Sequence, residues 1–177
     1  LNLRALSRCG FRNLLGVDPY IKEDIIINDH LKILKKSIQV VKGEWDLVMF
    51  HHSFEHMADP LETLTCVSRI LSPVGMCLLR VPIISCYAWE HYGLNWVQLD
   101  APRHFYLHSP QSINILANKS GFNLKEIHYD STELQFWGSE QNIKGIPLMS
   151  DRSYLINPFR SIFSPAAIKA YKQKANL

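Results

Sequence analysis

The stretch 45–81 constrains the fold of this chain more than any other part of its sequence. It begins with the apolar run Trp45–Phe50 and ends with a second apolar run, Met76–Val81. Between the two runs, Asp59 can cap a helix and Pro60 suits its first position. Nearly continuous apolar strands joined by a helix are typical of parallel strands that are covered on both faces. We therefore predict an open α/β sheet with helices on both faces.

Weaker sequence signals elsewhere in the chain predict further helices and strands. Gly10 and Gly121 favour helix ends, and Ser–Pro pairs favour helix starts. The expected strands are Leu14–Val17, Leu31–Leu34, Phe122–Tyr129 and Thr132–Trp137. The expected helices are Leu1–Cys9, residues 60–71, residues 110–120 and a final helix that Ser164-Pro165 opens. We also expect a helix stop at Ser72–Gly75 and a long irregular segment over Pro82–His108.

Composition and charge exclude several classes of protein. The chain has 177 residues, of which 47% are hydrophobic and 20% charged, as in one soluble globular domain. Its net charge of +3 is spread along the sequence, so we expect no nucleic-acid partner. No apolar run approaches the ~20 residues of a membrane span. The cysteines lack CxxC spacing, which favours free thiols and a reducing, cytoplasmic compartment.

The polar residues that follow the predicted strands are candidates for a ligand site, because open α/β sheets bind ligands beyond the carboxyl ends of their strands. This rule brings Asp18, Lys36–Ser37, His51–His56 and Pro82–His108 to one crevice. A carboxylate such as that of Asp18 can accept both hydroxyl groups of a ribose. The same residue can instead start a turn ahead of Pro19. The residues by themselves leave both alternatives open.

The histidines and aromatic residues of these regions have structural alternatives as well. His52 and His56 have the i, i+4 spacing of metal ligands on a helix, but the predicted helix starts after them, so we expect no metal site. His104 can be a catalytic group or a packing residue. Arg103 can bind an anionic group of a substrate or pair with Asp100. A substrate lid and the packing of a long loop would use the same aromatic residues: Trp89, Tyr92, Trp96, Phe105 and Tyr106.

Four sequence segments follow one another in a distinctive order. They are GVDPY (Gly16–Tyr20), WDLVMFHHSFEHMADP (Trp45–Pro60), RILSPVGMCLLRVP (Arg69–Pro82) and DAPRHFYLHSPQSINILANKSGF (Asp100–Phe122). In the same order, they resemble four parts of class I S-adenosylmethionine-dependent methyltransferases. These parts are the end of the second strand, the fourth strand with the loop that follows it, the start of the fifth strand, and the segment that follows the fifth strand. The resemblance implies a Rossmann-like, mostly parallel sheet, S-adenosyl-L-methionine as cofactor, and methyl transfer to a small-molecule or glycan acceptor.

The resemblance also implies roles for individual residues. The implied cofactor-binding residues are Asp18 at the ribose, Pro19 and Tyr20 beside the adenine, Lys36 and Ser37 at the adenine edge, and Phe50 and His51 at the methionine part. His56 and His104 are the implied catalytic residues, because a histidine that titrates near neutrality can act as a general base. Trp96 and Arg103 are the candidates for substrate binding.

One feature of the sequence departs from the pattern of that family. The glycine-rich loop between the first strand and the first helix is absent, because the sequence begins where that helix would be ending. We therefore expect a methyltransferase-like domain over residues 1–138 that is truncated at its N-terminus and lacks the first strand. Such a chain needs the missing first strand and glycine-rich loop to be supplied elsewhere. Within it, 82–108 is the expected lid, and 139–177 form a C-terminal extension.

Two other functional classes remain open at this point. A non-catalytic binding or assembly module would keep the fold and need no glycine-rich loop. A nicotinamide-dependent oxidoreductase would share Asp18 but would not explain the stretch His51–His56, so we rank it last. The leading hypothesis is a cytoplasmic methyltransferase, compatible with a homo-oligomer, whose acceptor atom the sequence does not specify.

Overall fold

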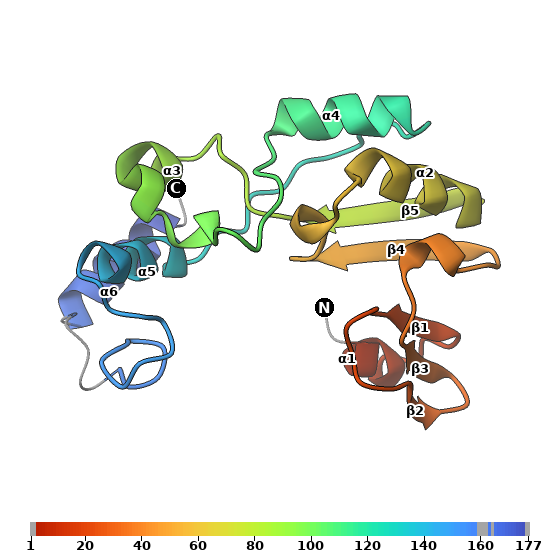
Figure 1. The fold of residues 1–177 in the computed structure, drawn as a ribbon, viewed down its shortest axis with the longest axis horizontal. Helices are drawn as coiled ribbons and strands as arrows, with labels where there is room; N and C mark the ends of the chain where they lie inside the picture. The colour runs from red at the N-terminus through yellow and green to blue at the C-terminus, as the bar shows by residue number, and fades with distance from the viewer. Residues whose placement is uncertain (1–2, 159–162, 164, 176–177) are drawn as a thin grey trace. The chain divides into compact units, whose positions relative to one another are not determined.

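The chain divides into two compact units, each with its own core. The computed structural model in Figure 1 describes residues 3–158, 163 and 165–175. The first unit consists of Leu1–Val81 and Ile115–Asn123, and the second consists of Pro82–Asn114 and Leu124–Leu177.

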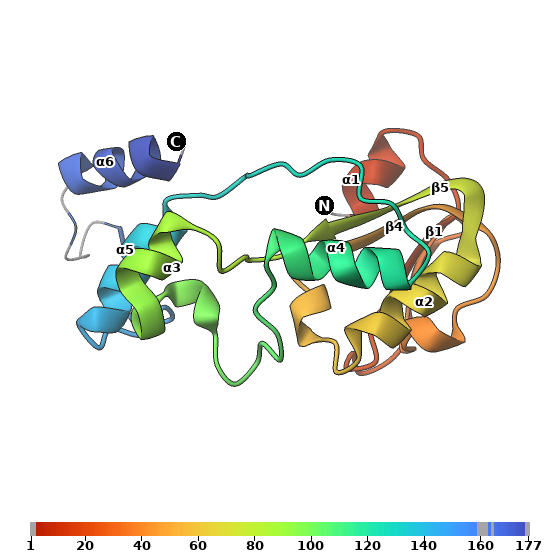
Figure 2. The ribbon, with the colours of Figure 1, turned by 90° about the horizontal axis from the view of Figure 1, so that it is seen from above.

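The first unit contains two small β-sheets. Its strands are β1 (Leu14–Val17), β2 (Ile25–Asn28), β3 (Leu31–Leu34), β4 (Trp45–His51) and β5 (Leu71–Arg80). β3 lies between β1 and β2, parallel to β1 and antiparallel to β2. β4 and β5 form a parallel pair and run side by side in Figure 2. The predicted strands that correspond to β1, β3 and β4 are confirmed, whereas β2 is not among the predicted elements.

The α-helices α1 and α2 of the first unit lie at predicted positions, whereas its 3₁₀ turns are not among the predicted elements. They are α1 (Leu3–Arg8), the 3₁₀ turns η1 (Ile38–Val40) and η2 (Phe54–His56), and α2 (Pro60–Ile70). The Asp59 carboxylate accepts the N–H of Glu62 at 2.8 Å and so caps α2 as predicted. α2 packs against β5 and buries the side chains of Leu64, Val67 and Ile70. The predicted helix over 1–9 is confirmed for α1, and its positions 1–2 lie outside the described residues.

The junction between α2 and β5 differs from the prediction. The expected helix stop at Ser72–Gly75 lies inside β5, where Trp45 pairs with Leu71 and the register then shifts before Leu47. A Cβ atom on Gly75 would lie 2.9 Å from the backbone oxygen of Trp45. This irregularity therefore requires glycine, because it brings two backbones too close for any side chain.

The second unit is built from helices, and one of them, α4, begins in this unit and ends in the first. Its elements are α3 (Tyr87–Tyr92), the 3₁₀ turns η3 (Gly93–Asn95) and η4 (Val97–Leu99), the start of α4 (Pro110–Lys119), α5 (Leu134–Ile143) and α6 (Pro165–Ala175). Ser109 and Ser112 cap α4 reciprocally, each side-chain oxygen accepting the backbone N–H of the other residue at 2.9–3.1 Å. The predictions of α4 and of a final helix are confirmed, although Ser164 lies outside the described residues.

Three predictions for the second half of the chain are wrong. The segment Pro82–His108 is not irregular throughout, because it contains α3 and two 3₁₀ turns. The predicted strand Phe122–Tyr129 has no regular secondary structure, and the predicted strand Thr132–Trp137 lies mostly in α5. α5 buries five consecutive residues, Gln135–Ser139, so its sequence lacks the single apolar stripe of an amphipathic helix. That is why a strand was the natural interpretation.

Aromatic side chains form the core of the second unit, and buried polar groups hold α5 in place. The core cluster comprises Ala88, Tyr92, Trp96 and Phe136. A Cβ atom on Gly138 would lie 2.8 Å from a methyl carbon of Val97, so α5 approaches η4 closely. The N–H of Val97 also donates to the hydroxyl of Ser139 at 3.0 Å. The buried amide of Gln141 accepts the N–H of Tyr154 at 2.8 Å.

The architecture confirms the predicted fold class. Both β1–β3 and β4–β5 are parallel, α2 lies between β4 and β5 along the chain, and the antiparallel β2 makes its sheet mixed. Within the described ranges no helix has the length and apolar character needed to span a membrane. Cys9, Cys66, Cys77 and Cys86 are free thiols.

Candidate functional site

The carboxyl ends of β1 and β3 bring Asp18 and Lys36 together. Val17 and Leu34 are paired at the ends of these parallel strands, and the two residues follow them. The carbonyl oxygen of Leu34 accepts the N–H of Asp18 at 3.1 Å and that of Lys36 at 2.8 Å. Ser37 then precedes the turn η1. The strand ends thus place three of the predicted cofactor-binding residues at one edge of the sheet.

The carboxylate of Asp18 has a fixed orientation and remains accessible. One of its oxygens accepts the N–H of Tyr20 at 2.8 Å, across the turn that Pro19 makes. Asp18 is exposed, and the Tyr20 side chain is 93% exposed. Asp18 therefore starts a turn and also presents a carboxylate to solvent, so the two sequence alternatives are compatible. A carboxylate that is held in this way fits the hydroxyl groups of a ribose as an acceptor.

The end of β4 combines a buried aromatic pair with histidines. Phe50 and Phe54 are buried, and their rings meet edge to face with centroids 5.6 Å apart. His51 is the last residue of the strand and pairs with Arg80 of β5. The N–H of His52 donates to the carbonyl of Arg80 at 2.9 Å, and the backbone φ of His52 is +50°. The chain therefore turns sharply directly after the strand.

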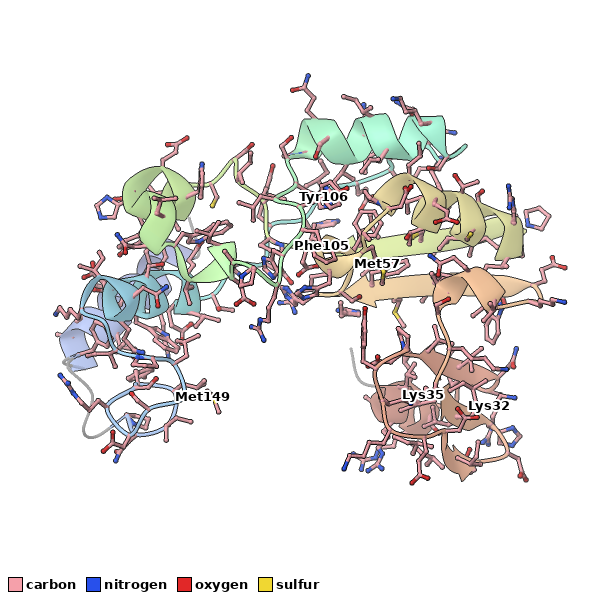
Figure 3. The ribbon with its side chains drawn as sticks, viewed as in Figure 1. Lys32, Lys35, Met57, Phe105, Tyr106 and Met149 are labelled. Carbon is pink, nitrogen blue, oxygen red and sulfur yellow. The ribbon has the colours of Figure 1, made fainter. Side chains whose placement is uncertain are left out.

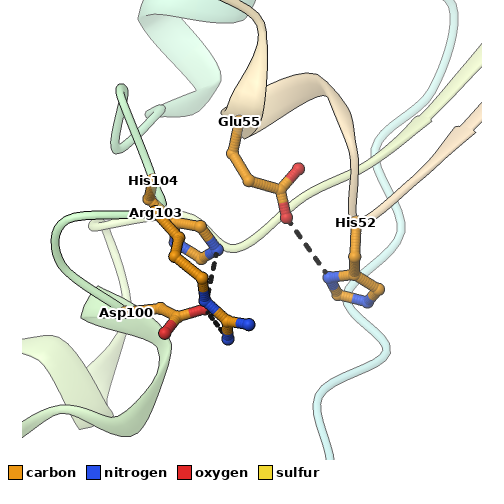
Figure 4. A network of polar contacts seen from close by, with 5 residues as sticks. All are labelled: His52, Glu55, Asp100, Arg103 and His104. Atoms are coloured by element: carbon orange, nitrogen blue, oxygen red, sulfur yellow. Dashed lines mark hydrogen bonds and ion pairs between the residues drawn. The ribbon is translucent and has the colours of Figure 1, made fainter. Parts of the chain in front are cut away.

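A buried carboxylate lies in the turn η2. The Glu55 side chain is fully buried, and one of its oxygens lies 3.6 Å from Nδ1 of His52, as Figure 4 shows. His56 belongs to the same turn, and its N–H donates to the carbonyl of Ser53 at 3.2 Å. His52 and His56 therefore precede α2, as predicted. The expectation that the chain binds no metal stays a prediction.

In the second unit, Asp100 organises the loop that carries Arg103 and His104. The Asp100 carboxylate accepts a hydrogen bond from the Arg103 guanidinium and lies 3.8 Å from Nε2 of His104, which Figure 4 also shows. Asp100 adopts a left-handed backbone conformation, and its carbonyl accepts the N–H of both residues. The hydrogen bond that Arg103 donates to Asp100 raises the pKa of Arg103. The pairing of Arg103 with Asp100, one of the two alternatives, is thus present.

The aromatic residues of this segment divide into buried and exposed groups. Trp96 is 1% exposed and packs edge to face on Trp89, with ring centroids 5.8 Å apart. Its indole N–H has no hydrogen-bond partner within the described part of the chain. Phe105 and Tyr106, labelled in Figure 3, are exposed. Trp96 is therefore placed as a core residue, and its contact with an acceptor stays a prediction.

Sequence reasoning missed two buried polar residues. Glu55 was passed over as a residue between two histidines, although a carboxylate three positions after His52 in a tight turn is a recognisable signal. His108 is buried, its backbone pairs with that of Ile83, and burial lowers the pKa of its imidazole. Nothing in the local sequence distinguishes His108 from an exposed histidine, because its burial depends on distant residues.

Comparison with known proteins identifies the family to which these features correspond. The sequence model of a family described as "Methyltransferase domain" matches residues 1–127, which is more than half of the chain. No match was found among curated proteins or among solved structures. The family match confirms the resemblance to class I methyltransferases, the Rossmann-like fold class and S-adenosyl-L-methionine as the cofactor.

Proposed function

This chain belongs to the methyltransferase domain family, and from that premise we propose that it transfers a methyl group to a small-molecule or glycan acceptor. The single observation that carries the assignment of its site is the Asp18 carboxylate. It follows β1 directly, is oriented by the N–H of Tyr20, and stands beside the end of β3. This is the edge of an α/β sheet at which ligands bind.

We assign the adenosyl part of the cofactor to this edge. Asp18 would accept the ribose hydroxyls, Pro19 and Tyr20 would flank the adenine, and Lys36 and Ser37 would approach its edge. Phe50 and His51 at the end of β4 would line the methionine part. When bound, S-adenosyl-L-methionine supplies a sulfonium methyl group. The residues of the chain then have to orient the acceptor, exclude water and remove a proton where the acceptor carries one.

Two histidines are proposed to accept that proton. His56 lies in η2, next to the buried Glu55. His104 lies in the second unit and has the Asp100 carboxylate at 3.8 Å, which favours one ring orientation. Arg103 is held by the same carboxylate and is proposed, with Trp96, to contact the acceptor. An anionic group on the acceptor would compete with Asp100 for the guanidinium.

We also propose the limits of the domain, its cellular location and its oligomeric state. Residues 1–138 form the proposed methyltransferase domain, with 82–108 as its lid and 139–177 as a C-terminal extension. A cytoplasmic location and self-association into a homo-oligomer are part of the same proposal. The free thiols of the cysteines are compatible with a reducing compartment.

Calorimetric titration of the full chain with S-adenosylhomocysteine tests the assignment. We expect Asp18→Asn to weaken binding by about tenfold or more, because a hydrogen bond to a charged group contributes roughly 1.5–3 kcal/mol. The amide retains an oxygen for the N–H of Tyr20, so the turn survives. Asp24→Asn is the matched control, since Asp24 is also exposed and its carboxylate accepts the N–H of Lys35 at 2.6 Å.

Three results would count against the proposal. Absence of binding by the unchanged chain would remove the cofactor site, and equal affinities for the Asp18 and Asp24 variants would remove the role of Asp18. Binding of the cofactor without methyl transfer to any of a panel of small-molecule and glycan acceptors would favour the non-catalytic binding module.

A further inference from the structure

A hollow opens in the first unit between α1 and the turn that joins β2 to β3. Its volume is about 360 Å³. The residues that line it are Arg4, Ser7 and Arg8 from α1, Ile27 and Asn28 from β2, and Leu31 from β3. All six belong to the first unit, and α1 packs directly on β1 and β3. The backbone around the hollow is therefore fixed by secondary structure.

The polar groups that line this hollow are hydrogen-bond donors. Arg4 and Arg8 are four residues apart, so they lie on the same face of α1, and Ser7 lies beside them. The side-chain oxygen of Asn28 accepts the N–H of His30 at 2.9 Å, which leaves the NH₂ group of Asn28 as its free donor. Two guanidinium groups, a hydroxyl and an amide NH₂ therefore face one space.

The lining contains no negative charge among the described residues. Asp29, which directly follows Asn28, is the acidic residue nearest in sequence to the residues of the lining, but it is not part of the lining. Ile27 and Leu31 supply an apolar floor, and Leu31 is 1% exposed. The hollow combines positive charge, donors and a small apolar surface.

The hollow lies at the opposite end of the strands from the proposed cofactor site. In the parallel β1–β3 pair, Leu14 and Leu31 are partners at the amino end, and Val17 and Leu34 are partners at the carboxyl end. The hollow includes Leu31, whereas Asp18 follows the carboxyl end. A ligand in the hollow is therefore distinct from the cofactor.

We propose that this hollow binds the phosphate group of a small phosphate monoester. Two guanidinium groups match the two negative charges and the several oxygens of such a group, because arginine binds oxyanions with paired N–H donors. A volume of about 360 Å³ exceeds what a phosphate needs and lies within the range of small-molecule sites. The ester carbons pack on the floor formed by Ile27 and Leu31.

The test is a titration of the full chain with inorganic phosphate and with phenyl phosphate, at constant ionic strength. We expect saturable binding of both, with phenyl phosphate the tighter ligand because of the apolar floor. The double substitution Arg4→Gln and Arg8→Gln should weaken both by about tenfold or more. Arg12→Gln is the matched control, since Arg12 is an exposed arginine nearby that does not line the hollow.

A second measurement avoids dependence on the folding of the variants. Phenylglyoxal modifies accessible arginines of the unchanged chain, and mass spectrometry locates the modified residues. Phosphate should protect Arg4 and Arg8 but not Arg12. Non-saturating binding, equal loss in the Arg12 variant, equal affinity for the two probes, or uniform protection would each overturn the proposal. Binding of S-adenosylhomocysteine should be the same in the double variant, which separates this site from the cofactor site.

Discussion

The two units of this chain use polar residues in opposite ways. The first unit buries aliphatic side chains between α2 and its strands and leaves Asp18 and Lys36 exposed at strand ends. The second unit has an aromatic core and also buries polar side chains, with Gln141 and Ser153 both fully buried and hydrogen-bonded to each other. Asp18 and Lys36 therefore remain available to a ligand, whereas Gln141 and Ser153 serve the fold.

This difference bears on how each unit is stabilised. A strand-and-helix core gains most from burial of apolar area, which adds up over many small side chains. The second unit relies on a few large rings and on specific hydrogen bonds such as that from Val97 to Ser139. Removal of one residue should therefore affect the second unit more than the first.

Trp96→Ala gives the sharpest test of this comparison. Trp96 is almost fully buried in the aromatic core, so its loss should lower the free energy of unfolding by about 3–5 kcal/mol. Urea unfolding followed by circular dichroism measures the change. Hydrogen exchange should show lost protection in α5 while the β4–β5 pair remains protected.

Trp96→Phe is the control for this substitution. It retains an aromatic ring, and it removes an indole N–H that has no hydrogen-bond partner in the described residues, so its effect should be clearly smaller. A loss below about 1 kcal/mol for the alanine variant would contradict the comparison. Simultaneous loss of protection in both units would contradict it too.

Asp59→Ala should have a smaller effect, confined to the first unit. It removes the carboxylate that accepts the N–H of Glu62, and loss of such a cap costs about 1 kcal/mol. Hydrogen exchange of the first turn of α2 should accelerate while that of α5 stays unchanged. Asp59→Asn is the control, because asparagine caps equally well. If both variants lose equal stability, the charge and not the cap is responsible.

His108 gives the smallest expected effect, and it depends on pH. Burial lowers the pKa of His108 in the folded chain, whereas an unfolded histidine titrates near ~6.5. As the pH falls below that value, the unfolded chain takes up the proton first, so the free energy of unfolding decreases. Thermal unfolding between pH 7.5 and 5.5 should show a smaller decrease for His108→Gln than for the unchanged chain. His30→Gln, an exposed position in the first unit, should not show this difference.

The comparison also explains which parts of the fold the sequence predicts. Apolar runs, prolines and capping residues are local signals, and they located β1, β3, β4 and α2 correctly. The second unit depends on contacts between distant positions, such as Gly138 against Val97. No local pattern encodes such contacts, and the sequence of Thr132–Trp137 therefore predicts a strand where the structure has the start of α5. β2 was missed because its pairing with β3 sets it, and Ile25 and Ile26 are exposed.

The sequence also predicts part of the arrangement of the candidate site. The rule that ligands bind at the carboxyl ends of strands places Asp18 and Lys36 together, and the structure has them bonded to the same carbonyl. The pairing of Arg103 with Asp100 is one of the two alternatives that the sequence leaves open. The burial of Glu55 and Trp96 could not be predicted, because burial is a property of the folded chain and both residue types are found at surfaces as well.

One cysteine of β5 shows what burial alone can do to reactivity. Cys77 pairs with Val48 in the β4–β5 ladder, and burial raises the pKa of its thiol to about 12. The thiolate is the form that reacts with oxidants and alkylating agents, so the raised pKa lowers the reactivity of this sulfur at neutral pH. Cys9 is exposed directly after α1 and is open to the same reagents. Burial in the parallel strand pair therefore makes Cys77 less open to oxidation and alkylation than Cys9.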